Sequence, residues 1–173
     1  MAYRNIRKDN DPVLRLKAKQ VNKYGNWLTK LLDDMVETMD LANGIGLAAP
    51  QIGISKRIIV IRLEEDLYRL INPEVVSEEG KVTEIEGCLS VPGMLGTVER
   101  AEKIKVIAND EEGKEIEISA EGILSIVLQH EIDHLEGILF TDIAKKVFDE
   151  SELEDDEVSN KVINPELMME EDN

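Results

Sequence analysis

The chain has 173 residues, of which 42% are hydrophobic and 33% are charged, and its formal net charge is −17. This length predicts one domain with a hydrophobic core of its own. The negative charge argues against direct nucleic-acid binding, because phosphate contacts require clustered lysine and arginine. No apolar run approaches a membrane span, the first residues carry no signal-peptide core, and the single cysteine excludes an intrachain disulfide. We therefore expect a cytoplasmic protein.

The negative charge is concentrated near the C-terminal end of the sequence. Residues 149–173 contain eleven acidic residues and one lysine, so this segment carries −10 of the total of −17. Dispersed like charge with few aromatic residues favours a tail that is partly helical or disordered. The sequence thus predicts a folded body over residues 1–148 and an acidic tail over residues 149–173.

The first 25 residues predict an irregular arm with a turn at Asp11-Pro12. Apolar residues then recur at helical spacing, which predicts an amphipathic helix over residues 26–41. The apolar stripe of this helix is expected to lie in the core, and its members are Trp27, Leu28, Leu31, Leu32, Met35 and Met39.

A glycine-rich connection follows at residues 43–53. Its Gly44-x-Gly46-x-x-Ala49 pattern matches the dinucleotide-binding fingerprint, but that fingerprint needs a strand before it and a helix opening within it. Here a helix comes first, and Pro50 opposes the continuation of a new helix. Two interpretations remain: a connection whose glycines let a ligand approach the backbone, or a plain loop.

Short β-rich segments fill the middle of the chain. Their composition predicts strands over residues 57–62, 68–72, 75–76, 99–108 and 115–118. Gly80 marks one turn, and residues 110–113 mark a hairpin turn. Short strands joined by hairpins, with helices before and after them, predict an α+β fold with mainly antiparallel sheets packed around a central C-terminal helix.

That C-terminal helix is predicted over residues 121–135. We expect Ser119 or Ala120 to begin it and Gly137 to end it. One face of the helix is formed by residues at the three-and-four spacing, namely Ile123, Ile126, Val127, His130 and His134.

His130 and His134 are the only histidines of the chain, and they lie four residues apart. On a helix this spacing places both imidazoles on one face, where they can bind one metal ion. Glu131 would then be free to act as a general base on a metal-bound water. The alternative is a pair of ordinary histidines on a half-buried helix, with a solvent-facing glutamate between them.

A catalytic metal site of this kind usually has a third protein ligand. In one class of peptidase the third ligand is a histidine six residues after the second, but this position is Phe140. The remaining candidates are Cys88 and a carboxylate. A lone cysteine is more often a small buried hydrophobe, but Cys88 lies between a glycine and a turn-forming Ser-Val-Pro-Gly sequence, which indicates a shaped loop.

Three segments, in this order, resemble the motifs of the peptide deformylase family. They are Gly44-Ile45-Gly46-Leu47-Ala48-Ala49-Pro50-Gln51, Glu86-Gly87-Cys88-Leu89-Ser90, and Gln129-His130-Glu131-Ile132-Asp133-His134. The body from about residue 3 to 143 is also similar to the family in length. Each motif alone is moderately specific, whereas the ordered set of three is very specific.

The resemblance implies a single catalytic domain over residues 1–148 that removes the formyl group from the N-terminal formylmethionine of newly made polypeptides. It implies a divalent metal ion bound by Cys88, His130 and His134, with Fe(II) as the leading candidate and Zn(II), Ni(II) or Co(II) as alternatives in purified protein. It further assigns Glu131 as the general base.

The resemblance also assigns the groups that would contact the substrate. The Gln51 amide and the Leu89 backbone N–H would stabilise the oxyanion, and Gly46 would lie beside the peptide backbone. The remaining substrate-binding positions it implies are Gly44, Ile45, Glu86, Ile123, Ile126 and Val127. The partners it implies are N-formylmethionyl nascent peptides, with a transient association with the ribosome compatible with this role.

Two features depart from the family pattern. Some relatives carry an arginine seven residues after the cysteine, where this chain has Leu95, and the acidic tail is not part of the pattern. Two other functions also need to be distinguished. One is a zinc endopeptidase whose third ligand is a downstream carboxylate such as Glu152 or Glu154, and the other is a non-catalytic acidic interaction protein.

Overall fold

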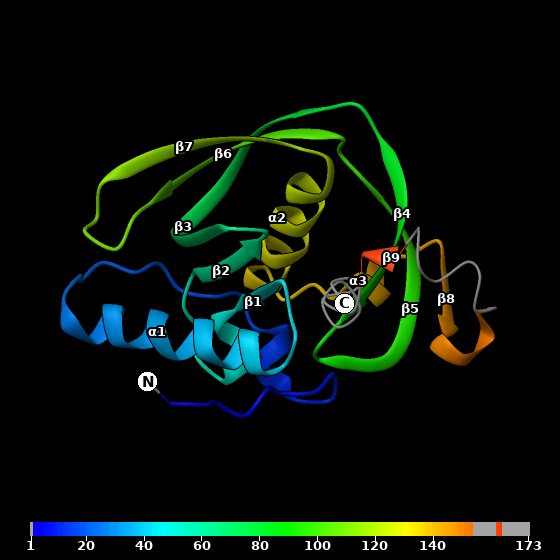
Figure 1. The fold of residues 1–173 in the computed structure, drawn as a ribbon, viewed down its shortest axis with the longest axis horizontal. Coiled ribbons are helices and arrows are strands. Elements are labelled where there is room, and N and C mark those ends of the chain that lie inside the picture. Colours follow the sequence, from blue (N-terminus) through cyan, green and yellow to red (C-terminus); the bar gives the residue numbers. More distant parts are fainter. Residues whose placement is uncertain (1, 154–161, 164–173) are drawn as a thin grey trace.

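A computed structural model describes residues 2–153 and 162–163 of the chain. Helix α2, Gly122–Leu135, lies in the middle of the molecule, between a five-stranded sheet and a four-stranded sheet (Figure 1). The longer helix α1, Asn26–Leu41, covers the other face of the five-stranded sheet. The α+β fold with mainly antiparallel sheets around a C-terminal helix is therefore confirmed. None of the helices within the described residues is long and apolar enough to cross a membrane.

The five-stranded sheet is antiparallel throughout, with the order β1-β2-β3-β6-β7. Its strands are β1 (Gly46–Ala48), β2 (Ile58–Leu63), β3 (Asp66–Glu79), β6 (Lys103–Asn109) and β7 (Glu115–Glu121). Successive side chains of a strand point to opposite faces. Accordingly, Ile58 and Val60 of β2 pack with α1, whereas Ile59 and Ile61 pack with α2. This alternation seats both helices on one continuous hydrophobic sheet.

The four-stranded sheet has the order β8-β5-β4-β9. It consists of β4 (Val82–Cys88), β5 (Val91–Arg100), β8 (Lys146–Asp149) and the short β9 (Val162–Ile163), which pairs parallel to β4. Helix α3, Phe140–Ile143, packs against this sheet. A small core joins Cys88, Val91 and Val98 of the sheet to Leu139 and Phe140. One end of β4 thereby brings Cys88 toward α2.

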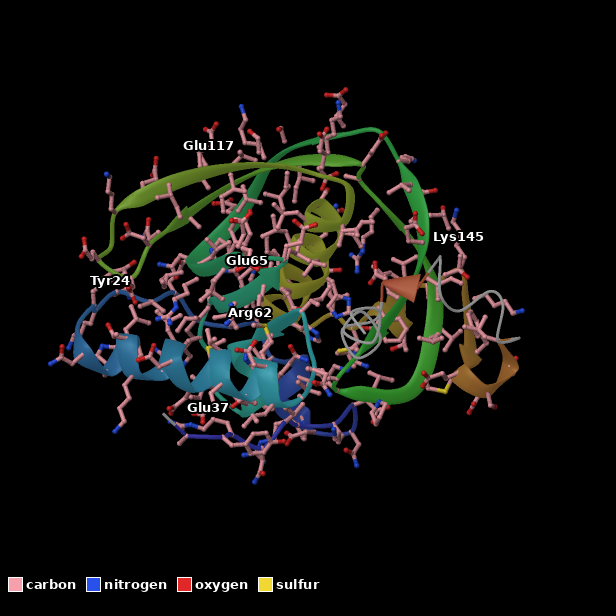
Figure 2. All side chains as sticks on the ribbon, viewed as in Figure 1. Tyr24, Glu37, Arg62, Glu65, Glu117 and Lys145 are labelled. Atoms are coloured by element: carbon pink, nitrogen blue, oxygen red, sulfur yellow. The ribbon has the colours of Figure 1, made fainter. Side chains whose placement is uncertain are left out.

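The N-terminal arm is tied to the rest of the molecule at several points. Pro12–Arg15 forms a 3₁₀ turn capped by the Asp11 side chain, in agreement with the predicted turn. Leu14 at its centre is fully buried. Further along the arm is Tyr24 (Figure 2). Its hydroxyl accepts a hydrogen bond of 2.8 Å from the Asn109 amide of β6.

The observed strands β4, β8 and most of β5 are not among the predicted ones, and two of the predicted ranges need correction. The strand predicted over residues 99–108 is confirmed from Lys103 onward, but it is not one strand, because β5 ends at Arg100 and β6 begins at Lys103 in the other sheet. No glycine or proline separates the two strands at residues 101–102, so the sequence carries no turn signal at this crossing. In contrast, the two short strands predicted on either side of Pro73 form the single strand β3, whose register shifts between Ile71 and Glu74. A proline cannot donate to a ladder, and such an irregularity accommodates it.

Both long helices differ from prediction at their first residues. The sequence predicts Trp27 in the core, but 45% of it is exposed, because the stripe of α1 that faces the sheet begins at Leu28. The predicted start of the second helix at Ser119 or Ala120 is also wrong. Strand β7 pairs with β6 as far as Glu121, and the helix begins at Gly122, whose φ is +62°.

Two smaller segments with loop-like sequences are more regular than predicted. Residues 43–53 contain the short strand β1 and a 3₁₀ turn, Ala49–Ile52, with Pro50 in its first turn. Cys88 lies at the end of β4, next to the turn that leads into β5. In both cases neighbouring strands supply backbone hydrogen bonds that the local sequence does not indicate.

Most of the predicted acidic tail, residues 154–161 and 164–173, lies outside the described residues. The first residues of the tail are described and continue the second sheet. Asp149 is the last residue of β8 and pairs with Met94, and Glu150–Glu152 forms a single 3₁₀ turn. The boundary predicted between residues 148 and 149 thus falls within β8.

Gly137 follows the end of α2, as the sequence predicts. Its φ of +74° favours glycine, and a Cβ at this position would lie 2.5 Å from the Arg15 carbonyl oxygen of the N-terminal arm. The arm and the end of the helix are therefore in backbone contact at a position where only glycine fits.

We expect Gly137→Ala to lower the free energy of unfolding by more than the ~1–2 kcal/mol that a positive φ alone costs a residue with a Cβ. Gly93→Ala is the matched control, since Gly93 has a φ of +77° and a Cβ added there would have no atom within 4 Å. Urea unfolding of both variants measures the difference. Equal losses in the two variants would show that the contact with Arg15 does not constrain the helix end.

Candidate metal centre

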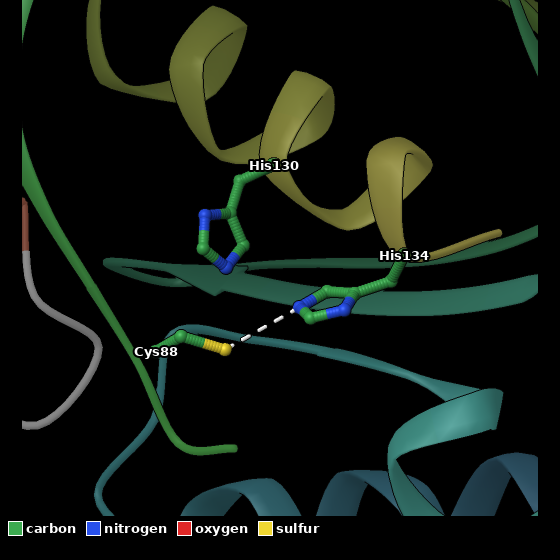
Figure 3. Close-up of side chains that lie close together, drawn as sticks. All are labelled: Cys88, His130 and His134. Atoms are coloured by element: carbon green, nitrogen blue, oxygen red, sulfur yellow. Dashed lines mark hydrogen bonds between the residues drawn. The ribbon is translucent and has the colours of Figure 1, made fainter. Parts of the chain in front are cut away.

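Three potential metal-binding side chains converge at the centre of the molecule (Figure 3). His130 and His134 project from one face of α2, and Cys88 reaches them from the end of β4. Their ligand atoms all lie within 4.8 Å of one another, and Cys88 Sγ is 3.4 Å from His134 Nε2. All three residues are buried. A cysteine distant in the sequence thus joins a pair of histidines that the helix itself aligns.

Their surroundings suit a metal ion. Two imidazoles and a thiol form a donor set that borderline ions such as Zn(II), Fe(II) and Ni(II) accept. Burial, together with the neighbouring His130, lowers the pKa of His134 well below its usual value, so this imidazole is neutral and able to bind a cation. Within the described residues, neither His134 Nδ1 nor Glu131 Oε2 has a hydrogen-bond partner, although both atoms are buried. Such unpartnered polar atoms are costly unless a further group is present.

Glu131 lies beside this cluster on α2, and 1% of it is exposed. Burial raises the pKa of its carboxyl to about 7, a value suited to exchanging protons near neutral pH. Gly46 of β1 lies against the carboxylate, because a Cβ on Gly46 would overlap Glu131 Oε1. The glycine-rich connection therefore approaches the helix closely at this point.

The Gln51 side chain is fixed next to Cys88. Its Oε1 accepts a hydrogen bond of 2.9 Å from the Ala48 backbone N–H. Its Nε2 donates to Ser90 Oγ at 3.1 Å and lies 3.6 Å from Cys88 Sγ. The amide N–H groups of Gln51 are thus directed toward the cluster rather than toward solvent.

The N-terminal arm holds the turn that carries Leu89. Lys8 Nζ donates to the Leu89 carbonyl at 3.2 Å, and the Asp9 backbone N–H donates to the Ser90 carbonyl at 2.8 Å. The Arg7 backbone N–H in turn donates to the Gln51 carbonyl at 2.7 Å. The sequence predicts this arm only as an irregular segment and does not reveal these contacts, because no local pattern encodes them.

The resemblance implies that Glu86 contacts the substrate, but its carboxylate is bonded to other groups of the protein. Its carboxylate accepts hydrogen bonds from Arg100 and lies 2.9 Å from His130 Nδ1. Burial alone would raise the pKa of Glu86, but these two partners outweigh burial and lower it to about 2. Glu86 is therefore a carboxylate in contact with a candidate metal ligand. Arg100 and Asp133 complete this group, and no pattern in the sequence indicates a role for either residue.

The other predicted site residues surround the cluster to different degrees. Ile45, Ile126 and Val127 are buried, whereas 41% of Ile123 is exposed at the start of α2. Leu95, which replaces an arginine found in some relatives, is buried and pairs with Phe148 of β8. Leu95 therefore lies in the second sheet with its side chain buried.

The geometry disfavours the peptidase alternative. Glu152 is exposed on the 3₁₀ turn after β8, where its carboxylate accepts a hydrogen bond from the Asp149 backbone N–H, and it is not part of the Cys88–His130–His134 cluster. Glu154, the other carboxylate considered, lies outside the described residues.

An α+β fold in which two histidines of the central helix meet a cysteine from a neighbouring strand has the donor set of a metal-dependent hydrolase. Comparison with known proteins narrows this class, since the model of the polypeptide deformylase family matches residues 3–150. The chain belongs to this family, and the resemblance found in the sequence is confirmed together with the enzyme class.

Individual relatives agree with this assignment. The chain is 49% identical to a peptide deformylase of Acetivibrio thermocellus over 154 residues, which cover 89% of this chain and 91% of that protein. It is 52% identical to one of Caldanaerobacter subterraneus, with coverage of 89% and 97%. A crystal structure of a Legionella pneumophila peptide deformylase superposes with a TM-score of 0.81 at 48% identity, covering 83% of this chain and 87% of that one. One from Thermotoga maritima gives 0.83 at 39% identity, covering 84% and 100%.

The contact between Gly46 and Glu131 leads to a prediction. We expect Gly46→Ala to fold but to lose roughly 10²-fold in deformylase rate, because the new methyl group displaces the Glu131 carboxylate and small misplacements have effects of this size. Gly44→Ala is the comparison variant, since its methyl group would meet a flexible Leu89 methyl at 2.8 Å and not Glu131. If the two variants lose activity equally, the Glu131 contact is not the reason.

Proposed function

We propose that this chain removes the formyl group from the N-terminal formylmethionine of newly made polypeptides with the help of one divalent metal ion. Membership of the deformylase family supports the reaction. The main support for the metal ion is that Cys88, His130 and His134 are buried, with their ligand atoms within 4.8 Å of one another. Beside them, Glu131 Oε2 has no hydrogen-bond partner among the described residues.

The three converging side chains would hold the ion. When bound, it would polarise the formyl oxygen and lower the pKa of a water molecule toward neutrality. A thiolate ligand suits soft or borderline ions, and the family resemblance makes Fe(II) the leading candidate, with Zn(II), Ni(II) and Co(II) as alternatives. An iron–thiolate site is sensitive to oxidation. We therefore propose that the enzyme acts in the cytoplasm, where reducing conditions protect such a site.

Glu131 would transfer the proton. Its carboxylate lies next to the cluster, is excluded from solvent, and has Oε2 free of hydrogen bonds to other described groups. It would take the proton of the attacking water and deliver it to the amine that leaves when the formyl C–N bond breaks. Burial supports this role because a carboxylate with a raised pKa can both accept and release a proton near neutral pH.

Gln51 and Leu89 would stabilise the negative charge that develops on the formyl oxygen. Fixed donors directed at a developing oxyanion are worth several kcal/mol when they need no reorganisation. The Gln51 amide meets this condition, since Ala48 and Ser90 hold both of its ends. The turn with the Leu89 N–H is likewise held by Lys8 and Asp9.

The methionine side chain would bind along the face of α2 that leads to His130. Ile126 and Val127 offer buried apolar surface there, and the more exposed Ile123 lies one turn earlier. Gly44, Ile45 and Gly46 would also contact the peptide, and the methylene groups of Glu86 would complete the pocket. An unbranched thioether fits such a wall better than a charged group does.

The substrate identifies the partners and the place of action. Nascent N-formylmethionyl peptides are available at the ribosome, so a transient association with it accompanies this function. The net charge of −17 disfavours direct contact with ribosomal RNA. The acidic tail is proposed as an appendage that follows the catalytic domain, apart from Asp149 and Val162–Ile163, which pair with strands of the second sheet.

We expect Glu131→Gln to keep its metal ion and to lose about 10²–10⁴-fold in deformylation rate, since the amide cannot accept the proton. Glu136→Gln, just after the same helix but paired with Arg57 outside the site, serves as the control for loss of a carboxylate. Formate release from a formylmethionyl peptide and metal content would be measured for both. An activity of Glu131→Gln within a few-fold of the parent would remove Glu131 from the mechanism.

A further inference from the structure

Arg100, at the end of β5, is buried next to the metal centre but contacts none of its three candidate ligands in the hydrogen bonds observed. A buried guanidinium is costly unless its surroundings compensate its charge and its donors. The proposed reaction assigns it no role. The reason for its burial must therefore lie in the groups that it contacts.

The first contact of Arg100 is with Glu86 of β4. Arg100 Nε donates to Glu86 Oε1 at 2.7 Å, and Arg100 Nη2 donates to Glu86 Oε2 at 2.9 Å. Two parallel bonds of this kind fix the plane of a carboxylate as well as its position. Glu86 Oε2 also lies 2.9 Å from His130 Nδ1, so the fixed carboxylate orients the imidazole. The other ring nitrogen of His130 is then left for the cluster with Cys88 and His134 (Figure 3).

The second contact of Arg100 is with the helix that carries the histidines. Arg100 Nη1 donates to Asp133 Oδ2 at 2.5 Å, and Asp133 is three residues after His130 on α2. Arg100 thus connects β5 to β4 through Glu86 and to α2 through Asp133. These are the two elements that supply Cys88 and the histidines.

We propose that Arg100 is a positioning residue for the metal centre: with Asp133 as its second anchor, it fixes Glu86, and Glu86 fixes the ring of His130 for metal binding. This inference rests on the proposed metal site. Groups that hydrogen-bond to the second ring nitrogen of a metal-binding histidine commonly contribute about 10–100-fold to metal affinity or activity. A purely structural ion pair would instead affect stability and leave the bound metal unchanged.

Arg100→Lys tests the proposal, because lysine keeps the charge but cannot form two parallel bonds to Glu86. Arg62→Lys is the matched control, since Arg62 also bonds both oxygens of a carboxylate, that of Asp40, at 3.0 Å each, away from the cluster. The full-length protein and each variant would be loaded with Co(II). The measurements are the rate of Co(II) release to a chelator, the Co(II) absorption spectrum and the unfolding transition.

We expect Arg100→Lys to release Co(II) about 10–100-fold faster than the parent and to show a shifted absorption spectrum, whereas Arg62→Lys matches the parent in both. A release rate and spectrum of Arg100→Lys equal to those of the parent would overturn the proposal. If Arg100→Lys does not fold, Asp133→Asn decides, since it weakens only the second anchor. Faster release from Asp133→Asn than from Arg62→Lys supports the proposal, and equal release rejects it.

Co(II) binding by the parent protein distinguishes a failure of the positioning role from a failure of the proposed metal site. A parent that binds no Co(II) would contradict the metal centre itself and the positioning role with it. A parent that binds Co(II), together with an Arg100→Lys variant that holds it equally well, would contradict the positioning role alone.

Discussion

The packing of α2 between two sheets is the constraint on which the rest of the structure depends. One side of the helix contributes Leu128, Ile132 and Leu135 to the core with the five-stranded sheet. His130 and His134 then face the second sheet, where β4 ends at Cys88. Because the helix is rigid and buried on both sides, the two imidazoles cannot turn away from the thiol without loss of core packing. The same packing that stabilises the fold therefore assembles the proposed metal centre.

The groups around this centre are held in place by hydrogen bonds within the protein. Gln51 is held at both ends, Glu86 is bonded to the buried Arg100 and His130, and the N-terminal arm fixes the turn after Cys88. Glu131 Oε2, which is expected to meet the attacking water, keeps unused bonding capacity among the described residues. Fixed dipoles in a site without water are the main source of transition-state stabilisation in many enzymes.

The helix periodicity, the hairpin at residues 110–113 and the four-residue spacing of His130 and His134 could be predicted from the sequence because they depend on residues that are near in the chain. The residues alone left Cys88 and a carboxylate as candidates for the third ligand, and the family resemblance selected Cys88. The crossing of β5 into β6 at residues 101–102 could not be predicted, since no glycine or proline marks a turn between the two strands. The partners of Arg100 could not be predicted either, as they lie 14 and 33 residues away. Local patterns carry no information on such pairs.

The most direct test of this account is the metal content of Cys88→Ala, measured by elemental analysis together with the deformylation rate. Val98→Ala is the control, because Val98 belongs to the same small core as Cys88 and its truncation removes packing without removing a metal-binding group. The account predicts about one equivalent of metal in the parent and in Val98→Ala, and loss of both stoichiometric metal and activity in Cys88→Ala. A Cys88→Ala protein that keeps a full equivalent of metal and the parent's rate would contradict it.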